Sequence, residues 1–328
     1  MLLRENERTE FIFGVKSLQA VLIYKDLVSL AGKDAVLTDA PMKDYVSMKT
    51  GGPADYLIEP EDYETIARLL AYFREKGTPY LIIGKGSNLI PPDEGIRGVV
   101  VRLSDRLSKI EVNETRLTAQ SGAALSETAE KALEAGLTGL EFASGIPGTV
   151  GGAAAMNAGA YGGEMRDVIL ETLSINPMGE LVRLKGDEHR FGYRKSRIQD
   201  EKLTVLSVIM GLKAGDKSAI RHTMDDLNGR RRDKQPLEYP SAGSVFKRPE
   251  GYYAGKLIED CGLKGFALGG AMVSEKHSGF IVNTGSATTA DIKALICHIQ
   301  RTVFEKTGVS LETEVKIIEG STPCNFSS

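Results

Sequence analysis

The sequence predicts an α+β protein, and three observations lead to that fold class. Strand-like and helix-like stretches alternate through the first two thirds of the chain, glycine is concentrated in one part of it, and longer helices appear after about residue 215. The chain has 328 residues, which corresponds to two or three domains at roughly 100–200 residues each. No internal repeat and no low-complexity linker is found in the sequence.

Short apolar runs bounded by glycine or polar residues predict strands, and apolar residues at helical spacing predict helices. After a charged tail we expect a helix from Ser17 to Leu30. Gly77 and Gly136 are expected to end two further helices, because glycine readily adopts the left-handed conformation found there. The first two thirds of the chain predict strands at 56–59, 80–83, 98–103, 168–175, 181–184 and 203–212, a hairpin over 109–119, and helices at 61–76 and 124–134.

The character of the chain changes in its last third. A charged helix is predicted from Lys217 to Asp233, with three consecutive arginines near its end, and a loop over 236–249 follows it. Beyond that loop we expect helices at 254–261 and 289–306, and strands at 279–283 and 311–318. The change near residue 215 is therefore a candidate domain boundary.

Composition and charge exclude several classes of protein. Hydrophobic residues make up 41% and charged residues 26%, as in ordinary globular proteins. The net charge of −3 gives no indication of nucleic-acid or membrane-surface binding. No apolar run approaches the ~18 residues of a membrane helix, and the N-terminal residues lack the apolar core of a signal peptide, so we expect a cytoplasmic location. Cys261, Cys297 and Cys324 are too scattered to predict a disulfide framework or a metal site.

Glycine is the compositional outlier. The chain has 36 glycines, about 11% against a usual ~7%, and nine of them fall between Gly136 and Gly163. Glycine reaches positive φ angles and lets a ligand approach the main chain closely. Clustering outside any repeat therefore indicates loops shaped around a ligand.

The first motif, Gly84-Lys85-Gly86-Ser87-Asn88, is followed by Leu89 and comes directly after a predicted strand. Consecutive small residues in a turn point several backbone N–H groups at one place, which suits a diphosphate. The motif is neither a P-loop nor the Gly-rich fingerprint of a dinucleotide fold. On base rates, a tight turn between strands is the more common explanation of such a segment.

The second motif runs from Ser144 to Gly152 and on to Gly162. Pro147 fixes one backbone dihedral while the neighbouring glycines free the next, which predicts a rigid, irregular wall that can lie against a flat ring system. Asn157 and Tyr161 could donate hydrogen bonds to that ring. The alternative is a glycine-rich structural crossover.

Three further segments carry candidate catalytic residues. Arg194 follows an aromatic residue and a glycine, Ser244 lies in a turn of small residues, and strand alternation would put Glu312 and Glu314 on one face. No histidine is placed to activate Ser244 as a nucleophile. The alternatives are a solvated surface arginine, a serine that stabilises its turn and an exposed polar face.

Taken in order, these motifs resemble those of the UDP-N-acetylenolpyruvoylglucosamine reductase family over about residues 37 to 320. Each motif is weak alone, but the ordered set is specific. The segments that carry the resemblance are KTGGPAD from Lys49, GKGSN, SGIPGTVGGAAAMNAGAYG, FGYRKS, PLEYPSAGSVFKRP, AGKLIEDCGLKG, HSGFIVN and LETEVKIIEG.

The resemblance implies an FAD-binding fold of the vanillyl-alcohol oxidase (PCMH) type in two subdomains, followed by a C-terminal α+β substrate-binding domain. It divides the chain into a tail and helix (1–35), FAD-binding subdomain 1 (36–104, joined by a C-terminal strand over 308–320), FAD-binding subdomain 2 (105–215) and the substrate-binding domain (216–307). Oligomeric state is not predicted.

The resemblance also implies site residues, each at a position that matches a family motif. Arg194, Ser244 and Glu314 match catalytic positions, and Tyr161 and Lys234 match substrate-binding positions. The residues that match FAD-binding positions are Gly84, Lys85, Gly86, Ser87, Asn88, Leu89, Gly145, Gly148, Gly152, Asn157, Gly159 and Ala160. FAD is expected to be bound non-covalently, because the first histidine, His189, and the first cysteine, Cys261, lie outside the proposed flavin loops.

The implied reaction converts an enolpyruvyl ether of a UDP-sugar into a lactyl ether, with NADPH as hydride donor. Hydride adds at C3, negative charge develops at C2 and its carboxylate, and a fixed cation such as Arg194 would stabilise that charge. Ser244 would protonate C2. Glu314 either acts as an acid or positions Arg194. The sequence contains no second dinucleotide-binding fingerprint that could bind NADPH, so NADPH is expected to enter the substrate's pocket.

The chain departs from the longer members of the family. Only Lys213 to Lys217 joins the predicted strand to the charged helix, where those members insert a loop with a substrate-capping tyrosine. The resemblance is thus to the shorter subgroup, the substrate lid is not identified, and Arg248 receives no role. The alternatives are a sugar oxidase of the same flavoprotein superfamily and a nucleotide-sugar binding protein without catalysis.

Overall fold

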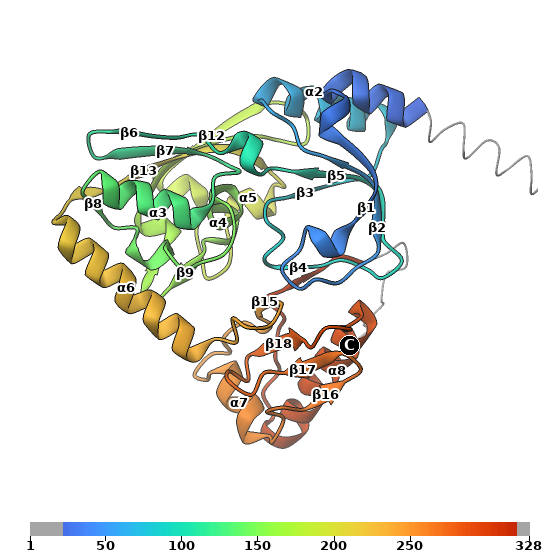
Figure 1. Cartoon of the computed structure of the whole chain (residues 1–328), viewed down its shortest axis with the longest axis vertical. Helices are drawn as coiled ribbons and strands as arrows, with labels where there is room; N and C mark the ends of the chain where they lie inside the picture. Colours follow the sequence, from blue (N-terminus) through green and yellow to red (C-terminus); the bar gives the residue numbers. More distant parts are fainter. Residues whose placement is uncertain (1–21, 320–328) are drawn as a thin grey trace, which may run out of the picture.

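The computed structural model describes residues 22–319, and Figure 1 shows that they form three regions. Residues 22–31 are helical, which confirms part of the predicted first helix, whereas Ser17 and the preceding tail lie outside the described residues. No helix in the described part of the chain is long and apolar enough to cross a membrane.

The first region is a four-stranded sheet in the order β1-β2-β5-β3. Its strands are β1 (Val36–Pro41), β2 (Pro53–Ile58), β5 (Ile96–Arg102) and β3 (Tyr80–Ile83). Helix α2 (Tyr63–Lys76) packs its apolar stripe on one face of this sheet, and Gly77 ends the helix at φ +62°, as predicted. Asp62 caps the helix start by accepting a hydrogen bond from the Thr65 N–H at 2.7 Å.

The second region is an antiparallel sheet in the order β12-β11-β13-β7-β6. Helices α3 (Leu125–Glu134) and α4 (Val150–Met156) bury their apolar residues in one core with this sheet, and α5 (Arg197–Asp200) packs on α4. The strands are β6 (Ile110–Asn113), β7 (Arg116–Gln120), β11 (Ile169–Ile175), β12 (Leu181–Lys185) and β13 (Thr204–Gly211), with two short pairs, β8 (Leu137–Thr138) with β14 (Lys213–Ala214) and β9 (Gly159–Ala160) with β10 (Gly163–Glu164).

Helix α6 (Lys217–Lys234) runs from the second region to the third, as Figure 1 shows. The third region is a sheet in the order β15-β18-β17-β16, with α7 and α8 packed against it. Its elements are β15 (Ser241–Ser244), α7 (Ala254–Asp260), β16 (Ala267–Leu268), β17 (Ala271–Val273), β18 (Phe280–Asn283) and α8 (Thr289–Thr307).

The chain finally returns to the first region. Strand β19 (Lys316–Ile317) pairs in parallel with β4 (Leu89–Ile90), which directly follows the Gly84–Asn88 motif. One end of the sequence is thereby placed beside a loop more than two hundred residues away. Short 3₁₀ helices complete the structure: η1 (Lys33–Ala35), η2 (Met42–Asp44), η3 (Asp105–Leu107), η4 (Glu141–Ala143), η5 (Met165–Asp167) and η6 (Gly186–His189).

Two of the predicted segments differ in the structure. The wall expected to be irregular contains helix α4, because three alanines and a methionine favour a helix and the Thr149 hydroxyl caps its start. The strand predicted at 311–318 is reduced to two residues. Glu312 and Glu314 therefore share no regular strand face: Glu312 pairs with Lys247, and Glu314 pairs with Arg194.

The loop predicted at 236–249 contains β15, and strands β1, β16 and β17 were not predicted. β15 has the sequence Ser-Ala-Gly-Ser, which lacks the β-branched and aromatic residues typical of strands. Its place in the sheet comes from pairing with β18, whose four residues are all buried. Tertiary pairing therefore outweighs local propensity here.

Candidate active site

A cavity of about 700 Å³ lies where the three regions meet, which is within the ~300–1,000 Å³ of small-molecule sites. We call its lining from 84–89 and 146–160 the glycine wall. We call the charged wall those lining residues that fall within 193–194, 231–248, 253–259, 276–280 and 314–316; not every residue of these ranges lines the cavity. The first and second regions supply the glycine wall, and the charged wall comes mainly from the third region.

The glycine wall is made of loops pressed closely together. A Cβ atom added to Gly84 would lie 2.4 Å from Thr149 Oγ1, and one added to Gly86 would lie 2.4 Å from the Tyr45 carbonyl oxygen. Gly86 also has a φ angle of +61°. The Ser87 hydroxyl donates to the Pro147 carbonyl at 3.1 Å and so joins the two motifs. These glycines are therefore required by backbone shape and by the space available.

The Gly84–Asn88 turn has the features of an anion site. Within residues 22–319, the backbone N–H groups of Lys85, Gly86 and Ser87 have no hydrogen-bond acceptor. Lys85 is itself one of the residues that line the cavity. Several N–H groups and an ammonium group directed at one place suit a diphosphate. This donor set fits the diphosphate of FAD.

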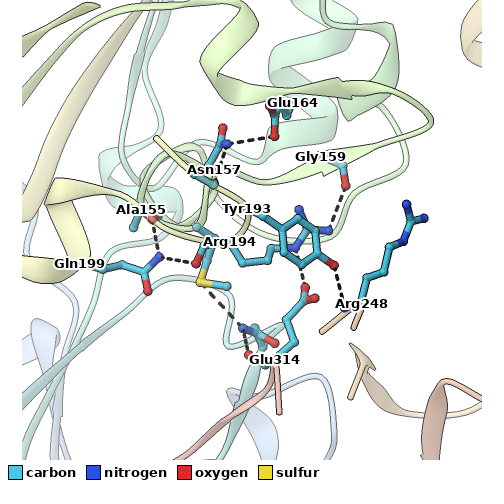
Figure 2. A network of polar contacts seen from close by, with 12 residues as sticks. Ala155, Asn157, Gly159, Glu164, Tyr193, Arg194, Gln199, Arg248 and Glu314 are labelled. Atoms are coloured by element: carbon cyan, nitrogen blue, oxygen red, sulfur yellow. Dashed lines mark hydrogen bonds and ion pairs between the residues drawn. The ribbon is translucent and has the colours of Figure 1, made fainter. Parts of the chain in front are cut away.

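Arg194 and Glu314 form an ion pair at the charged wall, as Figure 2 shows. Arg194 Nε donates to Glu314 Oε1 at 2.6 Å, and the two side chains are 20% and 14% exposed. Arg194 Nη2 also donates to the Gly159 carbonyl at 3.3 Å, and the guanidinium lies 5.1 Å from the Tyr193 ring centre. The guanidinium is therefore held between the two walls, with part of its surface facing the cavity.

Glu314 is itself held through its backbone. Its N–H donates to the Val245 carbonyl at 2.7 Å, and its carbonyl accepts from Asn88 Nδ2 at 3.2 Å. The Asn88 carbonyl in turn accepts from the Lys316 N–H at 2.9 Å. Asn88 thus connects the glycine wall to the segment that carries Glu314.

Ser244 ends strand β15 and lines the cavity next to this segment. It pairs with Phe280 of β18, and the preceding Gly243 has a φ angle of +80°. The Ser244 side chain is half-buried, and its hydroxyl has no hydrogen-bond partner among the described residues. The hydroxyl is therefore free to donate to a ligand.

Most of the predicted site residues lie at this cavity. Arg194, Ser244 and Glu314, which come from three distant segments, line it together. The other predicted residues that line it are Gly84, Lys85, Gly86, Ser87, Asn88, Leu89, Gly148, Gly152, Gly159 and Ala160.

Four predicted residues lie outside the lining. Tyr161 is 44% exposed and Lys234 is exposed, and their substrate roles stay predictions. Gly145 lies behind the lining, where an added Cβ would be 3.1 Å from Arg231 Cδ.

The side chain of Asn157, predicted to bind the cofactor, is bonded within the protein in this structure. Its side chain is 0% exposed, and its amide nitrogen donates at 3.0 Å both to Glu164 Oε2 and to the Gly192 carbonyl. Its Oδ1 accepts from the Arg166 N–H at 2.9 Å. Both amide hydrogens are therefore engaged within the protein, and the predicted role of Asn157 in cofactor binding stays a prediction. Asn157 instead stabilises a left-handed turn at φ +42°.

Two further arginines line the cavity: Arg231, from the Arg230–Arg232 cluster for which the sequence suggests diphosphate binding or a solvated helix end, and Arg248, for which it predicts no role. Arg231 has no ion pair in the described part of the chain, and burial lowers its pKa from the ordinary value. Arg248 packs its guanidinium 4.4 Å from the Tyr253 ring centre, and its backbone N–H donates to the Tyr193 hydroxyl at 3.3 Å. Of the three consecutive arginines, Arg231 lines the cavity. The helical period shows that the three point in different directions, but it does not tell which one faces a site.

Two buried polar atoms at the charged wall lack partners. Ser278 Oγ and Gln235 Oε1 are buried without a hydrogen bond to any described residue, and both residues line the cavity. A buried polar atom without a partner is costly unless a ligand or water satisfies it. This wall is therefore built to receive a polar ligand. Ser278 lies in the motif HSGFIVN, which the sequence singled out without predicting a role for this serine.

Comparisons with known proteins agree with this geometry. Residues 54–185 match the family model "FAD binding domain", and residues 235–318 match "UDP-N-acetylenolpyruvoylglucosamine reductase, C-terminal domain". The chain is 50% identical over 296 residues to the UDP-N-acetylenolpyruvoylglucosamine reductase of Clostridioides difficile, covering 90% of this chain and 97% of the relative. It is 51% identical over 296 residues to the Geobacillus kaustophilus protein of the same name, with the same coverage.

A solved structure shows the same fold. The crystal structure of UDP-N-acetylenolpyruvylglucosamine reductase from Thermus caldophilus aligns with a TM-score of 0.74 at 35% identity, covering 86% of this chain and 97% of that chain. These matches confirm the predicted fold class, an FAD-binding fold followed by a C-terminal α+β domain.

Proposed function

The chain belongs to the UDP-N-acetylenolpyruvoylglucosamine reductase family, and we propose that it reduces UDP-N-acetylglucosamine enolpyruvate to UDP-N-acetylmuramate, using FAD and NADPH. This reaction belongs to peptidoglycan precursor synthesis and would take place in the cytoplasm. The observation that carries the proposal is the convergence of Arg194, Ser244 and Glu314 on one cavity whose opposite wall fits a diphosphate.

FAD supplies hydride-transfer chemistry when bound. The backbone N–H groups of Lys85, Gly86 and Ser87 and the Lys85 ammonium would hold its diphosphate, and Gly148, Gly152 and Gly159 would allow close approach along the glycine wall. No histidine or cysteine lies on that wall, which supports non-covalent binding. The two FAD-binding subdomains would be 36–104 with 308–320, and 105–215, with residues 216–307 binding substrate.

Arg194 would bind the enolpyruvyl carboxylate and stabilise the charge that develops there. Its guanidinium is permanently charged, has five donors and already faces the cavity. The direct ion pair supports a role for Glu314 in orienting Arg194, because a carboxylate bonded to Nε leaves the outer edge of the guanidinium for substrate.

Ser244 would hold the proton that is delivered to C2 of the enolpyruvyl group. Its hydroxyl has no partner among the described residues, so it can donate without breaking an existing bond. The cationic residues of the charged wall would stabilise the Ser244 alkoxide that remains, since a positive charge favours the deprotonated form.

NADPH and the sugar nucleotide would occupy the same space in turn. Both carry a diphosphate, and the charged wall offers Arg231, Arg248 and Lys276 to receive one. Alternate occupation predicts ping-pong kinetics. Parallel lines are expected in double-reciprocal plots when both substrates are varied, and intersecting lines would count against a shared site.

The proposed function is tested by NADPH oxidation in the presence of UDP-N-acetylglucosamine enolpyruvate. The purified protein should show a flavin absorption spectrum and release all of that flavin on denaturation. It should oxidise more than one equivalent of NADPH per flavin only when the enolpyruvyl compound is present. A colourless protein, or a flavoprotein that uses oxygen and a sugar instead, would overturn the proposal.

A further inference from the structure

We propose that Gln199 is a positioning residue that holds Arg194 in its functional backbone conformation. The inference rests on the proposed function, in which Arg194 contacts substrate. Gln199 does not contact the substrate; it acts by binding the main chain of Arg194. Figure 2 shows its side chain between the Ala155 carbonyl and the backbone of Arg194.

The backbone of Arg194 adopts a conformation that needs support. Arg194 has a φ angle of +55°, in the left-handed region where a residue with a side chain is strained. Such strain costs on the order of 1–3 kcal/mol and persists only where surrounding contacts hold it. Arg194 occupies a tight hairpin closed by Gly192 and Lys195, whose N–H groups donate to each other's carbonyls at 2.9 and 3.2 Å.

Gln199 supplies that support from outside the hairpin. Its Nε2 donates to the Arg194 carbonyl at 3.2 Å and to the Ala155 carbonyl at 2.6 Å. Both acceptors are carbonyl oxygens, so the side chain must present its nitrogen to them, and both amide hydrogens are used. A glutamate of the same shape would direct a negative oxygen at the same two carbonyls.

The second acceptor of Gln199, the Ala155 carbonyl, belongs to the glycine wall. Ala155 belongs to helix α4 and lines the cavity. The Ser196 hydroxyl also donates to the Ala155 carbonyl, at 2.6 Å. Removing the Gln199 amide therefore leaves the segment attached through Ser196 while it frees the Arg194 carbonyl. This separation makes a positioning role testable.

The contacts of Arg194 divide into two sets. Its guanidinium meets Glu314, the Gly159 carbonyl and the Tyr193 ring, and these contacts set the direction of the side chain. Gln199 bonds the main-chain carbonyl and fixes the point from which that side chain starts. A shift of about 1 Å in a catalytic group can cost on the order of 10²-fold in rate. The step that needs the Arg194 charge should therefore slow when Gln199 loses its donor.

The test uses the FAD-loaded protein and measures the two half-reactions separately by stopped flow. Gln199→Met should slow reoxidation of the reduced flavin by UDP-N-acetylglucosamine enolpyruvate by roughly 10- to 100-fold, because Arg194 is displaced. Gln199→Glu should slow it at least as much, because the new carboxylate repels two carbonyls. Gln199→Lys keeps a donor and should recover most of the rate. Flavin reduction by NADPH should stay near the wild-type rate in all three.

Glu201→Gln is the matched control. Glu201 follows the same short helix, and among residues 22–319 its ion pairs are with Arg190 and Arg197 alone, with no hydrogen bond to Arg194 or Ala155. Its loss should change surface ion pairing and leave both half-reactions unchanged. The inference is overturned if Gln199→Met and Gln199→Glu reoxidise within about twofold of wild type, if both half-reactions slow equally, or if Glu201→Gln has the same effect.

A second measurement needs no substrate and so separates this inference from the proposed function. The Arg194 Nε–H donates to a carboxylate, so its NMR signal, assigned by its loss in Arg194→Lys, reports the ion pair directly. That signal should move in Gln199→Met and remain in place in Glu201→Gln. An unmoved signal in Gln199→Met would overturn the positioning role even if the reductase reaction is observed. A moved signal without turnover would leave the positioning role standing and refute the proposed function.

Discussion

The glycine wall and the charged wall face the same cavity but are built in different ways. The glycine wall presents main chain: its loops come from two continuous motifs, and their shape depends on residues that lack a side chain. The charged wall presents side chains delivered by a hairpin, a helix end, a sheet edge and the returning C-terminal segment. The first wall suits a ligand that stays bound, and the second suits ligands that bind, react and leave.

This difference predicts that substitutions on the two walls separate cofactor binding from turnover. A change on the glycine wall should alter FAD content before it alters chemistry in the molecules that retain FAD. A change on the charged wall should leave FAD bound and affect one half-reaction. The experiments that follow test this separation, from the largest expected effect to the smallest.

Ser244→Ala should give the largest effect. Only the half-reaction with the enolpyruvyl substrate requires a proton at carbon, so flavin reduction by NADPH should remain near normal while reoxidation slows by ~10²–10⁴-fold. Ser244→Cys retains a transferable proton and should lose less. Stopped-flow absorbance of the flavin distinguishes the two halves. Reoxidation of Ser244→Ala at the wild-type rate would show that another residue donates the proton, with Glu314 as the first candidate.

Gly86→Ala should weaken FAD binding by roughly 10- to 100-fold, because strain of about 1–3 kcal/mol is added to a site that only glycine fits. The added Cβ would meet the Tyr45 carbonyl at 2.4 Å. Gly77→Ala is a matched control, since Gly77 has nearly the same φ angle, +62°, with no atom within 4 Å of the new Cβ and no place in the cavity. FAD titration of the apoprotein should separate them, and equal affinities would show that Gly86 is not part of the cofactor site.

Arg231→Met should raise the KM for the sugar nucleotide about tenfold, since a hydrogen bond to a charged group is worth roughly 1.5–3 kcal/mol. Arg231 lines the cavity without an ion-pair partner among the described residues. Arg230→Met is the control, because Arg230 pairs with Asp226 at 2.8 Å outside the lining. A KM that rises equally in both variants would indicate a general effect of helix charge.

Lys234→Ala tests the predicted substrate contact that the structure places outside the lining. If the Lys234 ammonium binds the substrate's diphosphate, KM rises while FAD content stays constant. The alternative is a cation placed favourably at the end of α6, which predicts an unchanged KM at low salt. Initial rates at two ionic strengths decide between these explanations.

The sequence predicted the glycine wall better than the charged wall, for a physical reason. Gly84, Gly86 and Gly148 are constrained by their own backbone and by close neighbours, so local composition already indicates a closely packed loop. The clustering of Arg194, Ser244 and Glu314 depends on β15 pairing with β18 and on β19 pairing with β4. No periodicity in the chain reveals those pairings, and the resemblance to a known family supplied what local pattern could not.

Asn157 and Gln199 show the same limit in opposite directions. Asn157 lies inside a glycine-rich motif and was assigned to the cofactor, but its amide is buried and bonded to the Glu164 carboxylate and to two backbone groups. Gln199 lies in an unremarkable polar stretch and was assigned nothing, yet it bonds the main chain of Arg194. The sequence shows which residues are near a site, but the direction of a side chain depends on the packing of separate elements.

The smallest expected effect concerns His189, which lies beneath the hairpin of the charged wall. Its ring is 0% exposed and stacks on Phe191, with ring centres 4.8 Å apart. Its Nδ1 bonds the Gly186 carbonyl at 2.9 Å, so Nδ1 carries the proton and Nε2 accepts from the Thr172 hydroxyl at 3.1 Å. Burial lowers the pKa of His189 below its ordinary value, so the folded protein favours the neutral ring.

The sign of the pH dependence follows from that neutral ring. Above about pH 6.5, His189 is neutral in both the folded and the unfolded chain, and its contribution to stability is fully present. As pH falls below that value, the unfolded chain takes up a proton that the folded chain resists, so the free energy of unfolding decreases until the folded pKa is reached. Each unit of pKa depression is worth about 1.4 kcal/mol.

His189→Gln, which cannot titrate, should be less stable than wild type at pH 7.5, and the difference in the free energy of unfolding should narrow towards pH 5.5. Urea unfolding of the holoprotein, followed by circular dichroism, measures this. His277, whose pKa burial also lowers, is present in both proteins, so the difference isolates His189. A gap that stays constant across this range would show that the hairpin carrying Arg194 does not depend on a neutral His189.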